Sequence, residues 1–369
     1  MIFGNYIQSI KIHANPVKDM PYILNSQLKN TMNDEEVDGQ QNGIVLCGVC
    51  KNVIGTLPVI RAAFEDLVAK SDMPCWAVFY ENNSDDGTDA ELMKWAKEVP
   101  EQVMVQCEKI TREEQLARGL ARTYDNSPCR MEQIAHARNR LLGMLEADTG
   151  PRSKAKYVIM IDMDNPVPFP VSAILRCIAR DPDGFDALIC NGLNPMGYMY
   201  DFYAYRDSQF PFGPEIMREA FWSGQHQCQV QTAMHNKTIF QNRQFRQNTG
   251  LLPYITVGSG FNGLCIFRRQ AIQGVRYSAI PTAEMNAEYE AMKCIPPLSK
   301  NAKTHVDGAT VGMYLFPKEK DSVDKGIFYF HNSGYNFPVV CEHVPFFAGM
   351  RARNKRRIYL CTDLVWNWI

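Results

Sequence analysis

The sequence carries almost no net charge and lacks both a long apolar run and a recognisable leader, and each absence excludes a class of protein. The formal net charge is -1, so bulk electrostatics do not favour nucleic acid or an anionic membrane as the main partner. No window approaches the roughly 18 uninterrupted apolar residues of a membrane span, and the first residues lack the regions of a signal peptide. We therefore expect a soluble, cytoplasmic protein with no nucleic-acid partner and no transmembrane segment.

A disulfide framework is not expected either, although the sequence has twelve cysteines. Four of them lie in apolar runs typical of strands, namely Cys47, Cys107, Cys190 and Cys265. Buried free thiols in a reducing compartment explain this pattern better than the disulfides of small secreted domains. Cys47 and Cys50 have CxxC spacing, but on a strand they would point to opposite faces of a sheet, which suits neither a metal site nor a redox turn.

Apolar patterning predicts that the first half of the chain alternates strand and helix. Continuous apolar runs typical of buried parallel strands occupy residues 43–50, 75–82, 103–107, 157–165 and 187–190. Helical spacing between these runs, as in Leu57, Ile60 and Phe64, predicts crossover helices. Because such helices must cover both faces of a mainly parallel sheet, we expect an α/β three-layer sandwich.

The remaining segments are less regular. Residues 1–42 are polar and weakly patterned, and we interpret them as an N-terminal extension to one domain of residues 43–369. Residues 108–130 are rich in charge and show no clear periodicity of apolar residues, which indicates a loop or an irregular insertion. The second half is richer in aromatic, Asn and Gln residues, as in 227–248, and long irregular segments inside a compact domain are usually functional loops.

Two carboxylates leave the fourth apolar run at a point where parallel sheets bind ligands. Asp162 and Asp164 follow the run YVIMI at positions i and i+2, and ligands of such sheets lie beyond the carboxyl ends of the strands. Mg²⁺ and Mn²⁺ prefer oxygen ligands and are commonly held by one or two carboxylates plus substrate phosphates. The pattern therefore predicts a divalent-cation site, with a solvated strand end as the alternative.

The second run ends in the polar turn 81–88, which allows two interpretations. Asn, Asp and Gly form turns readily, and Thr88 could simply cap the following helix. Such a turn also lies where a base or ribose would bind, and both interpretations can hold. Arg138 lies on the predicted helix before the acidic pair. Its side chain either belongs to a solvated helix face or makes a charge-assisted contact to a diphosphate.

These pieces, in this order, resemble the GT-A glycosyltransferases. The chain is most similar to the fungal capsule-associated (alpha-1,3-)mannosyltransferase family and more distantly to the fungal Golgi mannan polymerase subunits. The motifs that carry the resemblance are residues 81–88, 137–139, Asp162 with Asp164, 200–207, 257–264 and 341–343. They span roughly residues 43 to 361. The resemblance implies a GT-A (Rossmann-like) sandwich, with a nucleotide-sugar-binding half at 43–192 and an acceptor-binding half at 193–369.

The resemblance also implies roles for individual residues. Nucleotide-sugar binding is implied for Asn52, Glu81, Asn83, Asp86, Arg138, Asp162, Gly260 and Asn262. Metal ligands would come from Asp162, Asp164, His343 and His331, and catalytic groups from Glu342, Asp201, Asp207 and Arg206. Many members have a metal-binding histidine well after the late acidic residue, whereas no histidine follows His343 here. His331 and His343 could therefore equally be structural.

The activity implied is transfer of a sugar from GDP-mannose or a UDP-sugar to a glycan or glycoprotein acceptor, with Mn²⁺ or Mg²⁺. The families resembled are mostly retaining, so we expect retention, with Asp201 or Asp207 stabilising the cation. An inverting enzyme would use Glu342 as its base. Fungal members carry a membrane anchor that is not found here, so a bacterial or viral type of enzyme is expected. The alternatives are a sugar nucleotidyltransferase and a catalytically inactive glycan-binding domain.

One segment of the second half carries an expectation of its own. Residues 207–250 follow the 200–207 motif and combine aromatic residues with many amides. Aromatic faces pack on sugar rings and amides bond hydroxyls, so we expect this segment to form the acceptor side of the cleft. The alternative is a satellite core under a long loop.

Overall fold

The fold is seen in a computed structural model that describes nine parts of the chain. They are residues 41–121, 130–180, 184–213, 224–236 without 226, 254–291, 304–306, 309–315, 328–332 and 340–369. Most of the predicted extension 1–42 therefore lies outside the described residues.

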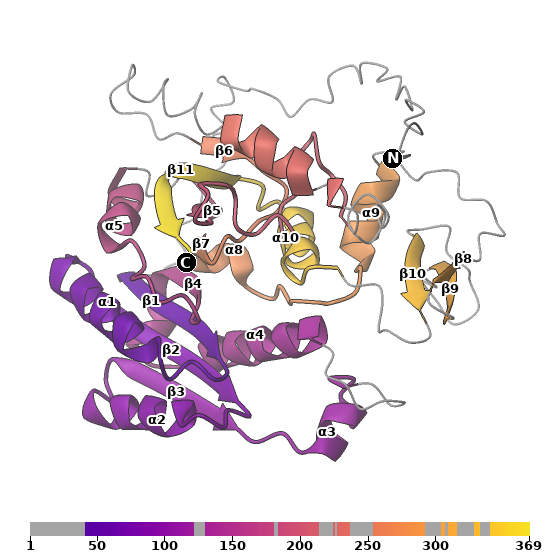
Figure 1. Cartoon of the computed structure of the whole chain (residues 1–369). Coiled ribbons are helices and arrows are strands. Elements are labelled where there is room, and N and C mark those ends of the chain that lie inside the picture. The colour runs from indigo at the N-terminus through magenta and orange to yellow at the C-terminus, as the bar shows by residue number, and fades with distance from the viewer. Residues whose placement is uncertain are drawn as a thin grey trace, which may run out of the picture. The chain divides into compact units, whose positions relative to one another are not determined.

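The main feature is an eight-stranded sheet with the order β3-β2-β1-β4-β7-β5-β11-β6 (Figure 1). Its strands are β1 (Gln41–Cys50), β2 (Cys75–Asn82), β3 (Val103–Glu108), β4 (Ala155–Asp162), β5 (Ala187–Leu193), β6 (Tyr254–Thr256), β7 (Leu264–Arg268) and β11 (Ile358–Asn367). Six of them run in one direction, and β7 and β6 run against them. The predicted mainly parallel sheet is confirmed.

Helices cover both faces of this sheet, so the predicted three-layer α/β sandwich is confirmed. On one face the core contains side chains of α1 (Leu57–Lys70), α2 (Thr88–Glu98) and α5 (Val171–Arg180). On the other it contains side chains of α4 (Arg130–Ala147), α8 (Arg269–Ile272), α9 (Ala283–Ala291) and α10 (His343–Ala352). Helix α1 illustrates how a helix attaches to the sheet, because Leu57, Ile60 and Phe64 are buried at helical spacing. Burying each of these side chains stabilises the fold by about 1.5–3 kcal/mol.

The cysteines behave largely as predicted. Cys47 belongs to the core on the α4 side and Cys50 to the core on the α1 side, so the CxxC pair does point to opposite faces. The ten cysteines within the described ranges are all free, and most are buried. Cys107 is only partly covered.

Two predicted boundaries differ from the structure. The strand expected at 157–165 ends at Asp162, so Asp164 lies on the loop beyond it. The segment 108–130, expected as a loop, contains helix α3 (Arg112–Ala117). Thr111 and Glu114 form a capping box at its start, a signal that is readable in the sequence when the apolar period is weak.

Smaller elements complete the described part. A short 3-10 helix, η1 (Pro151–Lys154), precedes β4. A separate antiparallel sheet has the order β10-β9-β8, with β8 (Thr304–Val306), β9 (Ala309–Leu315) and β10 (Phe328–Asn332).

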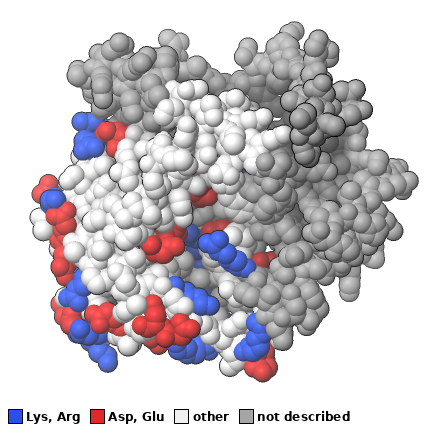
Figure 2. All heavy atoms as spheres, viewed as in Figure 1, with Lys and Arg blue, Asp and Glu red and all other residues white. Residues whose placement is uncertain are grey.

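The described surface matches the balanced charge of the sequence. On the face shown in Figure 2, Lys and Arg lie among Asp and Glu, mostly in the lower part and along the left edge, and most of the described area above them is uncharged. None of the helices within the described ranges is both long and apolar enough to cross a membrane.

Candidate active site

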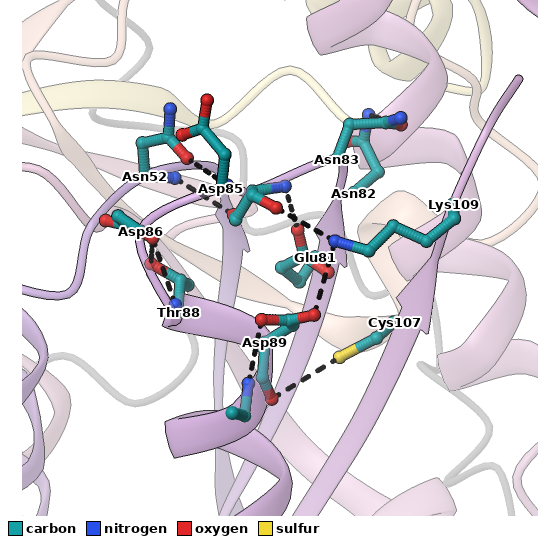
Figure 3. Close-up of polar contacts among 12 residues, drawn as sticks. Asn52, Glu81, Asn82, Asn83, Asp85, Asp86, Thr88, Asp89, Cys107 and Lys109 are labelled. Atoms are coloured by element: carbon teal, nitrogen blue, oxygen red, sulfur yellow. Dashed lines mark hydrogen bonds and ion pairs between the residues drawn. The ribbon is translucent and has the colours of Figure 1, made fainter.

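The polar residues singled out in the sequence gather at the carboxyl edge of the parallel strands. The first group surrounds the turn after β2, shown in Figure 3. Asn52 adopts a left-handed conformation with φ 55°, which Asn tolerates better than most residues. Its N–H donates to Ser84 Oγ at 3.0 Å, and its Oδ1 accepts from the Asp85 N–H at 2.9 Å. The loops after β1 and β2 are thereby tied together, with Asn52 and Asp85 left exposed at the edge.

Asp86 stabilises the same turn through hydrogen bonds. Its carboxylate accepts from the Thr88 N–H at 3.0 Å, from Thr88 Oγ1 at 2.6 Å and from the Ile54 N–H at 3.0 Å. Partial desolvation opposes its charge, but these hydrogen bonds outweigh that effect and lower the pKa of Asp86. The turn interpretation of this motif holds, but the expected cap is wrong: Thr88 is the first residue of α2, the N-cap is Gly87, and no side chain caps the helix there. A ligand-binding role stays compatible with the turn.

Glu81 lies beneath the turn and is fully buried. Its Oε1 accepts from the Ser84 N–H at 2.7 Å, whereas its Oε2 has no hydrogen-bond partner within the described residues. Asn83 bonds the backbone of Ile110 through both side-chain atoms, at 2.9 and 3.2 Å. The two residues therefore shape the turn, and only Asn83 is partly exposed.

The second group is a buried ion cluster around Arg138. This residue projects from α4 and is almost completely buried. Its Nη2 donates to Asp162 Oδ1 at 3.0 Å and its Nε to Glu342 Oε1 at 3.1 Å. The guanidinium also lies over the rings of Phe261 and Tyr277, 4.5 and 5.6 Å from their centroids. Burial opposes its charge, but the two carboxylates prevail, so the pKa of Arg138 lies above its ordinary value.

Carboxylates crowd this end of β4. Burial raises the pKa of Asp162 to about 7, with further increases from Asp164, Asp201 and Glu342 that Arg138 only partly offsets. Burial likewise raises the pKa of Asp201 to about 6. Asp164 is exposed. A site with this excess of negative charge favours a cation.

The donor set fits a metal ion held together with substrate. No group of three or more His, Cys, Asp or Glu side chains is arranged to enclose an ion in the part of the chain that the structure describes. One or two carboxylates completed by substrate phosphates are a common arrangement for Mg²⁺. Asp162 and Asp164 supply such a pair, on adjoining strand end and loop.

His343 lies behind this cluster. Its ring stacks on Phe261 with centroids 4.1 Å apart, and both ring nitrogens lack a hydrogen-bond partner in the described residues. Burial, followed by the charge of Arg138, lowers its pKa well below 6.5. A neutral, covered ring of this kind fits the structural alternative. His331 lies in β10, and its side chain is outside the described part.

The glycine-rich stretch 257–264 passes beside Asp162 and Asp201. The Asp162 N–H donates to Gly263 O at 2.8 Å, and the Asp201 N–H donates to Asn262 Oδ1 at 3.0 Å. Asn262 Nδ2 in turn donates to Cys190 O at 2.9 Å. A side chain on Gly260 would press on Ile189. Asn262 is thus a buried bridge between this stretch, β5 and the Asp201 loop.

Arg206 and Asp207 hold the loop before this stretch. Arg206 Nη1 donates to Tyr203 O at 2.9 Å and to Tyr205 O at 2.8 Å, and its backbone pairs with Ser259. Asp207 accepts from Tyr205 Oη at 2.6 Å. Both residues are buried. These contacts order the loop.

The segment 207–250 is described only at its start and in a helical stretch. Phe210 is buried in the core and Phe212 packs edge-on against Tyr289, as in the satellite-core alternative. Trp222 and the other aromatic residues of that prediction, Phe221, Phe240 and Phe245, lie outside the described residues. Sequence reasoning missed Trp368, which stacks on Tyr200 beside Asp201. Its only signal was an aromatic pair, Trp366 and Trp368, after an apolar run.

Comparison with known proteins identifies a family. The model of the family described as Cryptococcal mannosyltransferase 1 matches residues 73–296, which is more than half of the 369 residues. No curated protein matches the chain.

Solved structures give distant likenesses. A Pyrobaculum calidifontis mannosyltransferase, in complex with GDP-Man and Mn²⁺, is 14% identical over 68% of this chain and 52% of its own, with a TM-score of 0.31. A Mycobacterium tuberculosis glucosyl-3-phosphoglycerate synthase, with Mn²⁺, UDP and phosphoglyceric acid, is 12% identical over 68% and 64%, with a TM-score of 0.32. The mannosyl-3-phosphoglycerate synthase of Rubrobacter xylanophilus is 11% identical over 63% and 56%, with a TM-score of 0.31. Scores this low say nothing about donor or acceptor.

Proposed function

The chain belongs to the Cryptococcal mannosyltransferase 1 family, and on that premise we propose that it transfers a hexose from a nucleotide-diphosphate sugar to a glycan acceptor. The prediction of a GT-A glycosyltransferase is confirmed at the level of family and fold class. The finer proposal is that the donor is GDP-mannose, that transfer needs Mn²⁺ or Mg²⁺, and that the anomeric configuration is retained.

The observation that carries the proposal is the Arg138 cluster at the end of β4. Arg138 ties Asp162 to Glu342, which fixes the half-buried carboxylate of Asp162, and Asp164 faces solvent. We assign Asp164, with Asp162 beside it, to hold the metal, which when bound offsets the charge of the leaving diphosphate. We assign the exposed side chains of Asn52 and Asp85 to contact the nucleoside.

The chemistry requires one bond exchange at the anomeric carbon. The acceptor hydroxyl oxygen forms a bond to this carbon, and the bond to the diphosphate oxygen breaks, with its electron pair leaving on the nucleoside diphosphate. The transition state carries oxocarbenium-like charge. Asp201, partly exposed next to Asp162, is suited to stabilise that charge. In a retaining reaction the hydroxyl proton moves to the departing phosphate.

The position of Glu342 supports retention over inversion. An inverting base must reach the acceptor hydroxyl, whereas Glu342 is buried and bonded to Arg138 at 3.1 Å. Its contact orients Arg138, and through it Asp162. We therefore assign Glu342 as a positioning residue.

A donor panel tests this proposal. GDP-mannose, UDP-glucose and UDP-N-acetylglucosamine are each incubated with the protein, with Mn²⁺ or with a chelator, and release of the nucleoside diphosphate is measured. Metal-dependent release of GDP from GDP-mannose, above that from the UDP-sugars, is expected. Release from none of them would overturn the proposed activity, and release from a UDP-sugar alone would overturn the donor assignment.

The proposal extends to the compartment. Free cysteines throughout the described core support a reducing, cytoplasmic environment. Cys177 and Cys361, whose sulfurs lie 3.8 Å apart, are among them.

A further inference from the structure

An exposed tyrosine stands next to the carboxylate cluster with one face covered. The rings of Tyr200 and Trp368 stack in parallel, with centroids 4.0 Å apart and an interplanar angle of 4°. Trp368 is 6% exposed, whereas Tyr200 is 39% exposed. Because Trp368 covers one face of the tyrosine ring, the exposed area belongs to the opposite face and the ring edge.

Trp368 is fixed on two sides. Its backbone N–H donates to Leu193 O at 2.7 Å, which holds the residue against the end of β5. A side chain on Gly263 would overlap its indole ring, and Gly263 has a φ of +85°. Only glycine suits both the conformation and the close approach. The indole therefore forms a rigid support between the Gly263 loop and the Tyr200 loop.

This support is in direct contact with residues that order the carboxylates. Gly263 O accepts the Asp162 N–H at 2.8 Å, and Asp201 directly follows Tyr200. Burial raises the pKa of Tyr200, and the charges of Asp162, Asp164 and Asp201 raise it further. The tyrosine thus lies within electrostatic reach of the whole acidic group.

Two more exposed apolar side chains come from segments that adjoin this pair in the sequence. Six large apolar side chains are exposed in the described part, and three of them are Met196, Tyr200 and Ile369, at 77%, 39% and 80%. Met196 lies on the turn that returns to Tyr200, closed by the pairing of Leu193 with Met199, and Ile369 follows Trp368.

We propose that Tyr200 is a stacking platform for a hexose ring of the acceptor, and that Trp368 is the positioning residue that holds it. This inference rests on the proposed glycosyl transfer. The C–H face of a hexose packs on an aromatic face, and its hydroxyls at the ring edge then meet carboxylates such as Asp201. Because the donor is assigned to Asn52, Asp85 and the acidic pair, the platform is assigned to the acceptor.

Kinetics with mannobiose as acceptor and GDP-mannose as donor test the platform. Tyr200→Ala is expected to raise the KM for mannobiose about tenfold, with a much smaller change in kcat. Tyr200→Phe should restore the KM, because the face and not the hydroxyl makes the contact. Trp368→Ala should shift the KM in the same direction, and Trp368→Phe serves if the alanine variant does not fold.

A matched control exists at the other end of β11. Tyr359 stacks on Tyr254 with centroids 5.1 Å apart and an interplanar angle of 7°, so Tyr359→Ala removes a similar contact away from the site. It should keep the wild-type KM for mannobiose. An equal rise in KM in this control, or an unchanged KM in Tyr200→Ala, would overturn the platform.

Saturation-transfer NMR with mannobiose and no donor separates this inference from the proposed activity. Mannobiose signals in the wild type that disappear in Tyr200→Ala and persist in Tyr359→Ala support the platform, even if no GDP is released. GDP release with Tyr200-independent mannobiose binding leaves the activity standing and overturns the platform. Absence of mannobiose binding to the wild type, by NMR and kinetics together, also overturns it.

Discussion

Arg138 donates a hydrogen bond from Nε to Oε1 of Glu342 at 3.1 Å, across 204 residues of sequence. The contact joins the nucleotide-sugar-binding half that the sequence predicts at 43–192 to the acceptor-binding half at 193–369. Both groups are buried, so the structure depends on the pair being complete. Breaking a buried pair by removing one partner leaves a charge without compensation.

Arg138→Met is therefore expected to destabilise the protein by about 3–5 kcal/mol in urea unfolding. Arg276→Met is the matched control, because Arg276 pairs with Glu146 at 2.6 Å with both side chains at least 40% exposed. An exposed pair is worth about 0–1 kcal/mol. Equal losses of unfolding free energy in the two variants would show that the buried Arg138 cluster stabilises the protein no more than an exposed ion pair does.

His343→Phe tests whether this histidine is structural. Neither ring nitrogen makes a hydrogen bond within the described residues, although Nε2 lies 3.4 Å from Glu342 Oε1, and the ring stacks on Phe261. Phenylalanine should therefore preserve the fold and metal-dependent donor binding. Loss of metal binding in a folded variant would instead make His343 a ligand.

The same variant has a defined pH signature. The folded-state pKa of His343 lies well below 6.5, so the unfolded chain takes up the proton first. The stability linked to the neutral ring is fully present above pH 6.5 and is lost as pH falls below it. The unfolding free energy of the wild type, relative to His343→Phe, should fall by up to about 1.4 kcal/mol per pH unit there. A difference independent of pH between 7 and 5 would contradict the burial of a neutral ring.

Gly263→Ala tests the contact with Trp368. Both Gly263 and Gly87 have positive φ, but an added Cβ overlaps Trp368 at Gly263 and meets nothing within 4 Å at Gly87. Gly87→Ala should cost roughly 1–2 kcal/mol from backbone strain alone, and Gly263→Ala about 1–3 kcal/mol more from overpacking. In a Trp368→Ala background, the additional loss of unfolding free energy in Gly263→Ala should shrink. An unchanged additional loss would show that the new methyl group does not overlap Trp368.

Thiol chemistry tests the reduced state. Within the described ranges Cys228 is exposed, whereas burial raises the pKa of thiols such as Cys50. A thiol-reactive reagent should modify Cys228 before the buried thiols of the described residues in the native protein, and all twelve cysteines after unfolding without reductant. Mass analysis of unreduced protein that shows several native disulfides would contradict a reducing compartment.

Much of the fold follows from local pattern, because a buried parallel strand is recognisable as a short apolar run. β1, β2 and β4 were predicted in this way, and the abrupt change from YVIMI to Asp162 located the acidic pair. α3 was missed because its residues lack an apolar stripe, although Thr111 and Glu114 carry its capping signal. β11 was not predicted as a strand, and the antiparallel direction of β7 could not be seen in its own residues.

The parts of the site that depend on distant segments were not predictable from the pattern alone. Arg138 was placed near the diphosphate, but its bond to Glu342 requires α4 and the start of α10 to meet on the same face of the sheet. Trp368 gained its role only from Gly263 and Tyr200, which lie more than 100 residues away in sequence. The roles of the sequence-predicted site residues stay predictions until variants test them.

The central claim is that Asp164 holds the metal for donor binding and transfer. Calorimetry of GDP-mannose binding with and without Mn²⁺ tests it most directly, on the wild type, on Asp164→Ala and on Asp66→Ala, an exposed carboxylate of α1 that pairs only with Lys70 among the ion pairs described. The wild type and Asp66→Ala should bind the donor more tightly with Mn²⁺, whereas Asp164→Ala should lose this gain while melting at the wild-type temperature without metal. Undiminished metal-dependent binding in Asp164→Ala would contradict the account.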